Sequence, residues 1–518
     1  MATTVRRPTR LRCFAASAGQ AAAGTKITKL TKITKTKLFV FVIFVTFVIF
    51  VPQPSAVSPQ PPTFDLVIRG GRVVDPETNL DAVRDVGITG GRIAAVSAEP
   101  LTGAAVIDAR GLVVSPGFID LHTHVNGATT YRLAAQEGVT TALELEIGAP
   151  DVTAFLDARR GQAAINFGTS ASHPWARVRA FGGSAPADVI VPTSQRGTES
   201  VAGDAERQAI GARLEHELDA GALGVGMGLV YTPGATRAEA IDAFRVAASR
   251  RVPVFVHVRS SGRLEPGSSI ESVGEVIAAA AVTGASLHIV HINSSCTADA
   301  SECLRMIAGA RARGLDVTVE GYPYGAGMTD LKSSVFNPGW QQKIGVTEHD
   351  VAIPETGERL TAESFARYRA QPGPRLVLIY TNPDSIVDAV ITDPLTMIAS
   401  DSVLGHPRAA GAFARVLAHY VRDQRTLTLM DAIRKMSLMP AQRLQRATAA
   451  AARKGRLQVG ADADIAVFDL ATVADRATYA SPTLPATGFK HVLVNGTPVV
   501  RDGQLLDVTP GRAIVRDR

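Results

Sequence analysis

The amino-acid sequence predicts an α/β protein: a (β/α)8 barrel joined to a small β-sandwich that both ends of the body form together. Short apolar runs alternate with helical patterns through the middle of the chain, about residues 116–447. Strand patterns punctuated by glycine flank this middle on both sides, in residues 63–115 and 448–518. Strands that alternate with helices in this way are typical of a barrel. A doubly wound sheet is the alternative, and it is disfavoured because no glycine-rich phosphate-binding motif follows a strand.

Residues 1–62 differ in composition from the rest of the chain. They contain nine Lys and Arg residues and no acidic residue, and the basic stretch leads into LFVFVIFVTFVIFV at residues 38–51. This apolar run is shorter than the about 20 residues that span a membrane, so it indicates a signal peptide followed by a linker. An uncleaved membrane anchor and a translation start downstream of Met1 are the alternatives. We therefore expect an exported protein, periplasmic or secreted, with membrane contact only if residues 38–51 remain as an anchor.

The composition of the body gives no reason to expect a nucleic-acid partner. The formal net charge is +6, but outside residues 1–62 there are 45 basic and 48 acidic residues. Three cysteines are too few for a disulfide scaffold or for a zinc module built from cysteines alone. A chain of 518 residues that is 46% hydrophobic can bury a large core. At this length we expect one large α/β domain with a smaller partner, or two or three domains.

The patterns of the two flanking segments, residues 63–115 and 448–518, each predict a small antiparallel sheet. The first contains FDLVIRGGRVVDPETNLDAVRDVGITGGRIAAVS, in which apolar residues alternate and GG or PE marks the turns. The last contains HVLVNGTPVVRDGQLL, with the hairpin signals NG and DG. Two β-rich ends around one long middle predict a single β domain assembled from both.

The middle of the chain supplies eight candidate strands. They are GFIDLHTH, TTALELEIG, AINFGTS, LGVGMGL, VPVFVHV, SLHIVHIN, LDVTVEGYPY and LTMIASD. Helical patterns such as AERQAIGARLEHELDAG and RAEAIDAFRVAASRR lie between them. Residues 330–390 look irregular, and we expect them to form a lid.

Polar residues close several of these strands, where a parallel barrel carries its active site. His122 and His124 end the first strand, and alternation along a strand puts both on one face. His257 ends another strand, and Asp401 closes the last one. The strand SLHIVHIN contains two further histidines, of which His291 is nearer the C-terminal end. His288, deeper in that strand, is expected to be a core histidine.

This set of residue types predicts metal-assisted hydrolysis. Neutral imidazoles and carboxylates are zinc ligands, and a catalytic zinc keeps one position open for water. The metal lowers the pKa of that water and polarises a carbonyl oxygen. Asp401 is the candidate that accepts the proton of the water and passes it to the leaving nitrogen.

The order of these residues resembles the amidohydrolase superfamily. The segments PGFIDLHTH, EGVTTALELEIG, GALGVGMGLVYTPG, VFVHVRS, VEGYPYGAGMTD, IASD, HPRAAGAFARVL, MSLMPAQRL and KGRLQVGADADIAVFD narrow the resemblance to the N-acyl-D-amino-acid deacylase (D-aminoacylase) branch. The resemblance implies the same barrel and β-sandwich, with one or two zinc ions. The metal-site residues it implies are His122, His124, His257, His291 and Asp401. It also implies that Arg408 binds the substrate carboxylate and that Tyr322 lines the pocket.

Three positions depart from the pattern of that branch. The usual cysteine ligand is Ile147 here, with Glu146 beside it; the usual lysine after the fourth histidine is Asn293, and the usual serine after YPYxAG is Met328. The run ALELEIG places Glu144 and Glu146 in a buried strand, where charge is costly unless it is paired. Glu146 is nearer the C-terminal strand end, so we expect it to replace the thiolate and to bridge two cations. Glu144 is expected to orient a ligand from behind.

We therefore expect a zinc-dependent amidohydrolase that cleaves an N-acyl amino acid, above all an N-acyl-D-amino acid, or a related small amide. A cyclic amidohydrolase of the dihydroorotase or hydantoinase kind, or a dipeptidase, is the alternative within the superfamily. A binding protein without activity is a third reading. It is disfavoured because all four histidines and Asp401 are present.

Overall fold

The computed structural model describes residues 63–124, 127–186 and 189–517. The predicted signal peptide or anchor and the linker, residues 1–62, lie outside the described residues. Within the described part of the chain, no helix is both long enough and apolar enough to cross a membrane.

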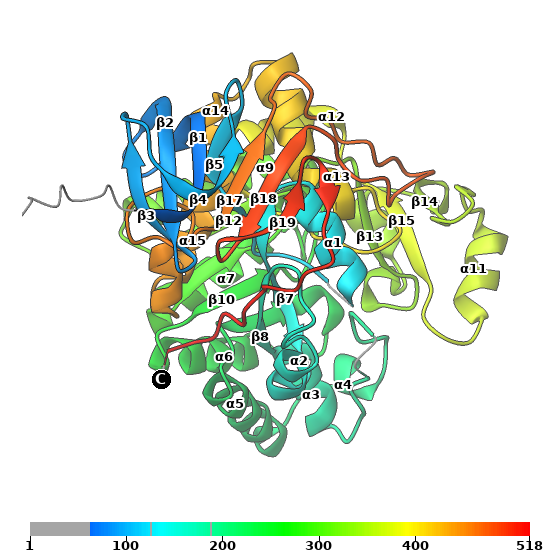
Figure 1. The fold of residues 1–518 in the computed structure, drawn as a ribbon. Coiled ribbons are helices and arrows are strands. Elements are labelled where there is room, and N and C mark those ends of the chain that lie inside the picture. Colours follow the sequence, from blue (N-terminus) through cyan, green and yellow to red (C-terminus); the bar gives the residue numbers. More distant parts are fainter. Residues whose placement is uncertain (1–62, 125–126, 187–188, 518) are drawn as a thin grey trace, which may run out of the picture. The chain divides into compact units, whose positions relative to one another are not determined.

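Eight parallel strands form the central sheet, and they follow the chain in order (Figure 1). They are β6 (Phe118–Asp120), β7 (Val139–Ala149), β8 (Asn166–Ser172), β9 (Val225–Gly228), β10 (Pro253–His257), β11 (Ser286–Ile289), β12 (Val317–Gly321) and β16 (Thr396–Ile398). Each overlaps one of the eight predicted runs. The first and last strands meet where Thr123 bridges Ser402 and where the Ser400 amide donates to Asp120 at 3.1 Å. The predicted barrel is confirmed.

Helices surround these strands, and their apolar faces share one large core with them. They are α1 (Ala128–Gln136), α2 (Val152–Asp157), α3 (His173–Ala180), α4 (Arg196–Glu199), α5 (Asp204–Asp219), α6 (Arg237–Ser249), α7 (Ser269–Thr283), α8 (Ile292–Cys296), α9 (Ala300–Ala312), α12 (Asp384–Thr392), α13 (Arg408–Arg415), α14 (Leu429–Ile433) and α15 (Met439–Leu444). The sequence sets their limits locally. For α7, Ser268 and Glu271 form a capping box at the start, and Gly284 ends the helix with a φ of 74°.

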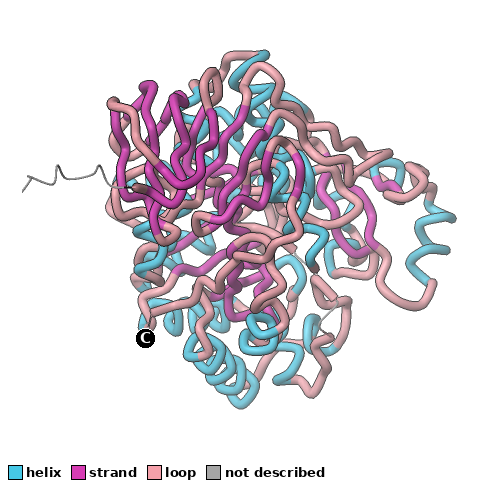
Figure 2. The backbone as a smooth tube through the Cα atoms, in the orientation of Figure 1, coloured by secondary structure: helices cyan, strands magenta, loops and turns pink. Residues whose placement is uncertain are grey.

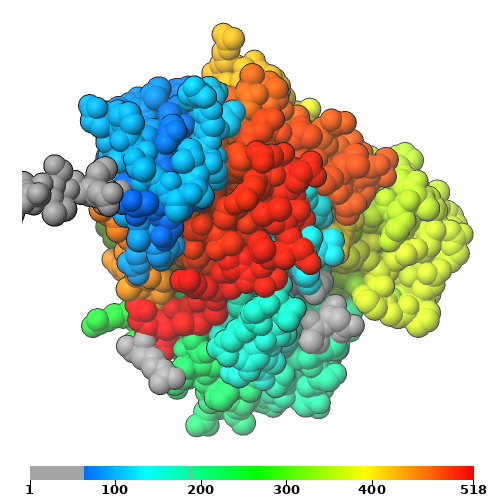
Figure 3. Space-filling view, in the orientation of Figure 1, coloured from blue at the N-terminus to red at the C-terminus, as the bar shows by residue number. Residues whose placement is uncertain are grey.

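A second sheet of nine strands combines both ends of the described chain. Its strands are β1 (Phe64–Asp75), β2 (Leu80–Thr89), β3 (Arg92–Ser97), β4 (Gly103–Asp108), β5 (Val113–Pro116), β17 (Ile465–Phe468), β18 (Phe489–Val494), β19 (Thr497–Arg501) and β20 (Gln504–Leu505). The two ends join where β5 pairs antiparallel with β17. Figures 1 and 3 show the blue N-terminal strands beside the orange and red C-terminal ones, and Figure 2 shows their strands together. The predicted β domain from both ends is confirmed.

This β domain folds as one continuous sheet because β1 bends. The pairing of β1 with β2 shifts register between Ile68 and Gly71, where Gly70 has a φ of 67°. Before the bend β1 pairs with β4, and after it β1 pairs with β5. The sheet can therefore enclose its own core, which contains residues from both chain ends such as Ile68 and Leu493.

Residues 326–380 form a small folded unit over the barrel rather than the irregular segment that the sequence suggested. A three-stranded antiparallel sheet, β13 (Ala326–Asp330), β15 (Leu376–Tyr380) and β14 (Val351–Ala352), packs with α10 (Trp340–Ile344) and α11 (Ala362–Ala370). Its own core includes Phe336, Trp340 and Phe365, which lie in ring contact. Opening and closing of this unit as a lid stays a prediction.

Candidate metal centre

Glu146 reaches the mouth of the barrel because β7 bulges. Glu144 pairs with Thr169 of β8, but Ala149 pairs with Ala171, so β7 carries three extra residues over this stretch. Gly148 accommodates the bulge with a φ of 74°, where a Cβ atom would lie 2.6 Å from the carbonyl oxygen of Ser170. The carboxylate of Glu146 is thereby buried among four histidines, while Ile147 faces the other way.

Two imidazole nitrogens and two carboxylate oxygens converge on one side of Glu146; we call this the first half of the centre. Nε2 of His122 lies 3.3 Å from Nε2 of His124, and Oε2 of Glu146 lies 3.1 Å from both. Oδ1 of Asp401 lies 3.4 Å from His122 Nε2 and 3.3 Å from His124 Nε2. Ligand atoms on a tetrahedral zinc ion are about 3.3–3.6 Å apart. The donors of His122, His124 and Glu146 therefore have the spacing of ligands on one zinc ion, and Asp401 lies within reach of both imidazoles.

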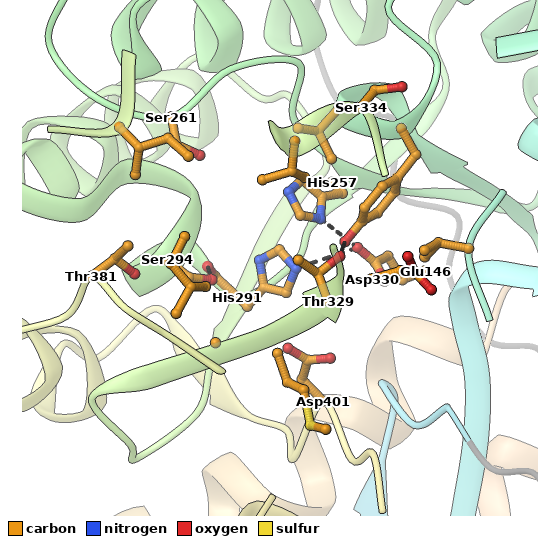
Figure 4. Close-up of a pocket in the computed structure, with 18 of the residues that line it drawn as sticks. Glu146, His257, Ser261, His291, Ser294, Thr329, Asp330, Ser334, Thr381 and Asp401 are labelled. Atoms are coloured by element: carbon orange, nitrogen blue, oxygen red, sulfur yellow. Dashed lines mark hydrogen bonds and ion pairs between the residues drawn. The ribbon is translucent and has the colours of Figure 1, made fainter. Parts of the chain in front are cut away.

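The other oxygen of Glu146 faces the second half of the centre. Oε1 lies 2.6 Å from Nδ1 of His257 and 3.3 Å from Nε2 of His291 (Figure 4). These three residues also lie close enough together to hold an ion. The donor set thus fits two ions that share the carboxylate of Glu146, as well as one ion in the first half alone.

Buried groups behind the histidines fix their orientation. Glu144 accepts from Nδ1 of His124 at 3.1 Å, and Nδ1 of His291 lies 3.0 Å from the hydroxyl of Ser295. Glu320, from β12, lies 2.6 Å from Nδ1 of His122. These contacts leave Nε2 of all three histidines free to face the centre.

Sequence reasoning missed Glu320. It is a carboxylate inside the apolar run LDVTVEG, which is the same signal that drew attention to Glu146. Its second oxygen lies 3.0 Å from Nε2 of His288, whose Nδ1 meets Thr318 at 2.8 Å. His288 therefore has both nitrogens occupied in the barrel interior, as expected for a core histidine.

The carboxylates and imidazoles stabilise each other's charges. Burial alone would raise the pKa of Glu146, but His122 and its neighbours hold it well below the usual range. Burial alone would lower the pKa of His122, but Asp401, Glu146 and Glu320 raise it to about 10. Without a metal, His122 and His124 therefore hold protons, whereas burial and His291 lower the pKa of His257.

The backbone is strained at two of these positions. Asp401 has a φ of 50° and His291 a φ of 27°, values that residues with a side chain rarely adopt. Such strain persists where the surrounding structure enforces it, often at functional sites. It turns both side chains into the centre directly after their strands end.

A cavity of about 280 Å³ opens onto the centre beneath the 326–380 unit. Histidines 124, 257 and 291, with Glu146 and Asp401, line its polar end (Figure 4). Its other walls are mostly apolar and include Ile190, Val230, Val335, Trp340, Leu376 and Ile379. The space suits a small molecule with one polar, reactive end.

The two predicted substrate-binding residues lie together beside Asp401. Tyr322 lines the cavity, whereas Arg408 is fully buried behind it, with its guanidinium 4.7 Å from the Tyr322 ring centroid. Nη2 of Arg408 lies 2.9 Å from Oδ2 of Asp401. Among the described residues, however, none of the guanidinium nitrogens has a partner at hydrogen-bond geometry. Arg408 thus holds its buried donors behind Tyr322, in an ion pair with Asp401 and outside the lining of the cavity.

The three departures from the D-aminoacylase pattern have structural explanations. Ile147 packs in an apolar cluster with Trp175 and Tyr231, away from the centre. Asn293 is buried, and its side-chain amide donates to the carbonyl oxygen of Tyr322 at 3.1 Å. Met328 lines the cavity. Only Met328 therefore occupies a place from which it can touch a substrate directly.

Comparison with known proteins agrees with this geometry. The amidohydrolase family model matches residues 105–500. An N-acyl-D-glutamate deacylase from Alcaligenes xylosoxydans xylosoxydans is 32% identical over 498 residues, which cover 88% of this chain and 97% of that protein. An allantoinase from Rubrobacter xylanophilus is 31% identical over 287 residues, 52% of this chain and 59% of that protein.

Two solved structures are also similar. The N-acyl-D-glutamate deacylase from Bordetella bronchiseptica, complexed with zinc and a phosphonate inhibitor, has a TM-score of 0.73 and 29% identity; the match covers 88% of this chain and all of that one. A D-aminoacylase described as having a binuclear metal centre has a TM-score of 0.73 and 27% identity, with the same coverage. This chain belongs to the amidohydrolase family of hydrolases.

Proposed function

We propose that this protein is a zinc-dependent amidohydrolase that cleaves the amide bond of an N-acyl amino acid, with N-acyl-D-amino acids as its main substrates. The observation that carries the proposal is the first half of the centre. Donor atoms of His122, His124 and Glu146 lie at the spacing of a zinc ion's ligands, with Asp401 beside the two imidazoles, at the polar end of a cavity sized for a small molecule. The names of its relatives support the choice of N-acyl-D-amino acids.

The residues that would hold zinc are His122, His124, Glu146, His257, His291 and Asp401. A zinc ion there would lower the pKa of a bound water and polarise the substrate carbonyl. The donor set supports one or two ions, with Glu146 shared between them.

Asp401 is the proposed proton carrier. Burial alone would raise the pKa of its carboxyl, but Arg408 and His122 hold it well below the usual range. Asp401 is therefore a carboxylate at neutral pH, able to accept a proton from the attacking water. It can then pass the proton to the leaving nitrogen, which departs as a free amine.

Arg408 and Tyr322 are proposed to bind the substrate carboxylate. The guanidinium has buried donors without partners, and a carboxylate matches two of them at once. To reach the cavity, the guanidinium must turn partly from Asp401 towards the side that Tyr322 lines. This would place the amide of the substrate next to Asp401.

A cyclic amidohydrolase or a dipeptidase is the second candidate. The partial match to an allantoinase favours the cyclic amidohydrolase. Arg408 argues against allantoin, hydantoins and dihydrouracil as substrates, because these rings carry no carboxylate to occupy a buried guanidinium.

We retain export, to the periplasm or beyond the cell, as a proposal that rests on residues 1–62. The proposed partner is a small-molecule amide, without nucleic acid. Membrane contact is proposed only through residues 38–51.

The test is a substrate panel on zinc-loaded protein. Hydrolysis is measured as release of free amine from N-acetyl-D- and N-acetyl-L-methionine and from a dipeptide, and as loss of the intact ring for allantoin and dihydrouracil, which open to ureido acids. We expect turnover of N-acetyl-D-methionine above all others. Preferential turnover of a cyclic amide or of the dipeptide would contradict the proposal, as would properly folded protein that binds no metal.

A further inference from the structure

A second cavity of about 920 Å³ lies behind the substrate site. Residues of the turn that follows β12, the end of β15, α12, α13 and residues 475–479 line it. Thr381 lines both cavities. Neither the metal centre nor the proposed reaction uses this second cavity.

One wall of the second cavity presents two buried donors without acceptors. The hydroxyl of Tyr324 is buried and has no hydrogen-bond partner within the described ranges, and the same holds for Nε of Arg415. The two side chains are neighbours, with the guanidinium 5.3 Å from the Tyr324 ring centroid, and Nη1 of Arg415 pairs with Asp475, which lines the same cavity, at 3.2 Å. Burial raises the pKa of Tyr324 well above its usual value, so its hydroxyl stays a donor. A buried donor without an acceptor is costly, and a bound carboxylate would supply one.

The lining of the same cavity also carries acceptors. Asp384 and Asp388, both on α12, line the cavity; Asp388 accepts from the hydroxyl of Tyr420 at 2.9 Å, and Asp384 is exposed. The ring of Tyr380 also lines this cavity. Carboxylates beside aromatic rings favour an ammonium group.

We propose that the second cavity binds a free α-amino acid, with its carboxylate on Tyr324 and Arg415 and its ammonium group on the aspartates of α12. This is the class of molecule that the proposed reaction releases, so in its physiological role the inference rests on the proposed function. The assignment of an amino acid to the cavity rests on the lining residues and does not depend on the proposed function.

Occupancy of the second cavity would reach the substrate site through two short connections. Asn382 lines the second cavity, and its side chain donates to the hydroxyl of Tyr322 at 3.4 Å. His406 packs against the Tyr324 ring, and its Nδ1 accepts from the backbone amide of Arg408 at 3.1 Å. A bound amino acid would therefore act on both proposed substrate-binding residues.

The test is calorimetric titration of zinc-loaded protein with D-methionine, L-methionine, methylammonium and acetate. We expect two binding sites per chain for a methionine, one of which disappears in Tyr324→Phe and the other in Arg408→Met. Tyr324→Phe removes only a hydroxyl without a partner, so the protein should fold and its melting temperature should hold or rise. A single site in the parent protein, or unchanged binding in Tyr324→Phe, would overturn the proposal. Saturation of the second site by methylammonium or acetate as tightly as by methionine would overturn the amino-acid assignment.

A kinetic measurement separates this inference from the proposed function. If N-acetyl-D-methionine is hydrolysed, added D-methionine should lower kcat in the parent protein and only raise KM in Tyr324→Phe. Purely competitive inhibition in both proteins would overturn the coupling. If no N-acyl amino acid is hydrolysed, the proposed function fails while the calorimetric result still decides the binding site.

Discussion

The two halves of the metal centre share Glu146 but are supported differently. In the first half, His122 is backed by Glu320 at 2.6 Å and His124 by Glu144 at 3.1 Å, both of them carboxylates. In the second half, Nδ1 of His291 lies against the hydroxyl of Ser295 rather than a carboxylate, and Nδ1 of His257 points at Glu146 itself.

The two halves also differ in exposure and spacing. The side chain of His257 is 13% exposed, against 1% for His122. The first half already has the spacing of a zinc ion's ligands, whereas the contact of 2.6 Å between His257 and Glu146 must open before an ion fits. We infer that the first half binds its ion more tightly and that Glu146 determines whether a second ion is held.

Glu146→Gln should have the largest effect, because an amide cannot give an anionic oxygen to both halves. We expect loss of at least one zinc ion per chain, measured by elemental analysis, and loss of activity. Glu144→Gln is the matched control: it alters the same strand but only the support of His124, and it should keep the metal content. Equal metal content in Glu146→Gln and the parent protein would contradict the account.

Asp401→Asn should come next, since it removes the proton carrier while keeping an oxygen at the first half. We expect kcat to fall by about 10²–10⁴-fold, as is usual for loss of a general acid–base group. Zinc content and melting temperature are measured on the same sample. A drop in KM alone, with kcat intact, would show that another group carries the proton.

Arg408→Met should shift the pH dependence of the reaction. The guanidinium holds the pKa of Asp401 below its usual range, and the active form is the carboxylate. Without the guanidinium that pKa rises, so activity should disappear at a higher pH as the solution is acidified. Profiles of kcat against pH test this, and KM should rise as well because the substrate carboxylate loses its partner. If both proteins lost activity at the same acidic pH, the proposed pairing of Arg408 with Asp401 would be contradicted.

Glu320→Gln tests the difference in support between the halves. We expect affinity for the more tightly bound zinc ion to fall by about 10–100-fold, because His122 loses its anionic partner. Ser295→Ala is the counterpart in the second half and should weaken only the more loosely bound ion. Competition with a metal chelator measures both. If Glu320→Gln and Ser295→Ala weaken the binding of the same ion, the inferred difference between the two halves is wrong.

Ile147→Cys should have the smallest effect on the metal. A thiol at this position would lie in the apolar cluster with Trp175 and Tyr231, away from the centre. We expect unchanged zinc content, with unfolding stability reduced by about 1–3 kcal/mol through the smaller side chain. Tighter zinc binding would show that residue 147, not Glu146, faces the centre.

The fold could be predicted almost completely from the sequence because its signals are local. Each barrel strand is a short apolar run between helical patterns, and the turn residues at both ends define the β domain. The unit of residues 326–380 was the exception. Its core depends on contacts between residues far apart in sequence, such as Phe336 and Phe365, which no short pattern reveals.

Only part of the site could be predicted from the sequence, because some of its residues depend on contacts that no local pattern shows. Histidines and an aspartate at strand ends can be recognised because a parallel barrel brings those ends together. The position of Glu146 depends on a bulge, which an ungapped comparison with relatives cannot show. Glu320 lies a full layer below the centre, and only the structure places it against His122.

The central claim is that Glu146 joins two ion sites of unequal strength. A crystal structure of the zinc-loaded protein, with anomalous data collected at the zinc edge, tests it most directly. The account predicts a full zinc peak among His122, His124, Asp401 and one oxygen of Glu146. A weaker peak is expected between the other oxygen, His257 and His291. Zinc bound with the carboxylate of Glu146 turned away from both sites would contradict it.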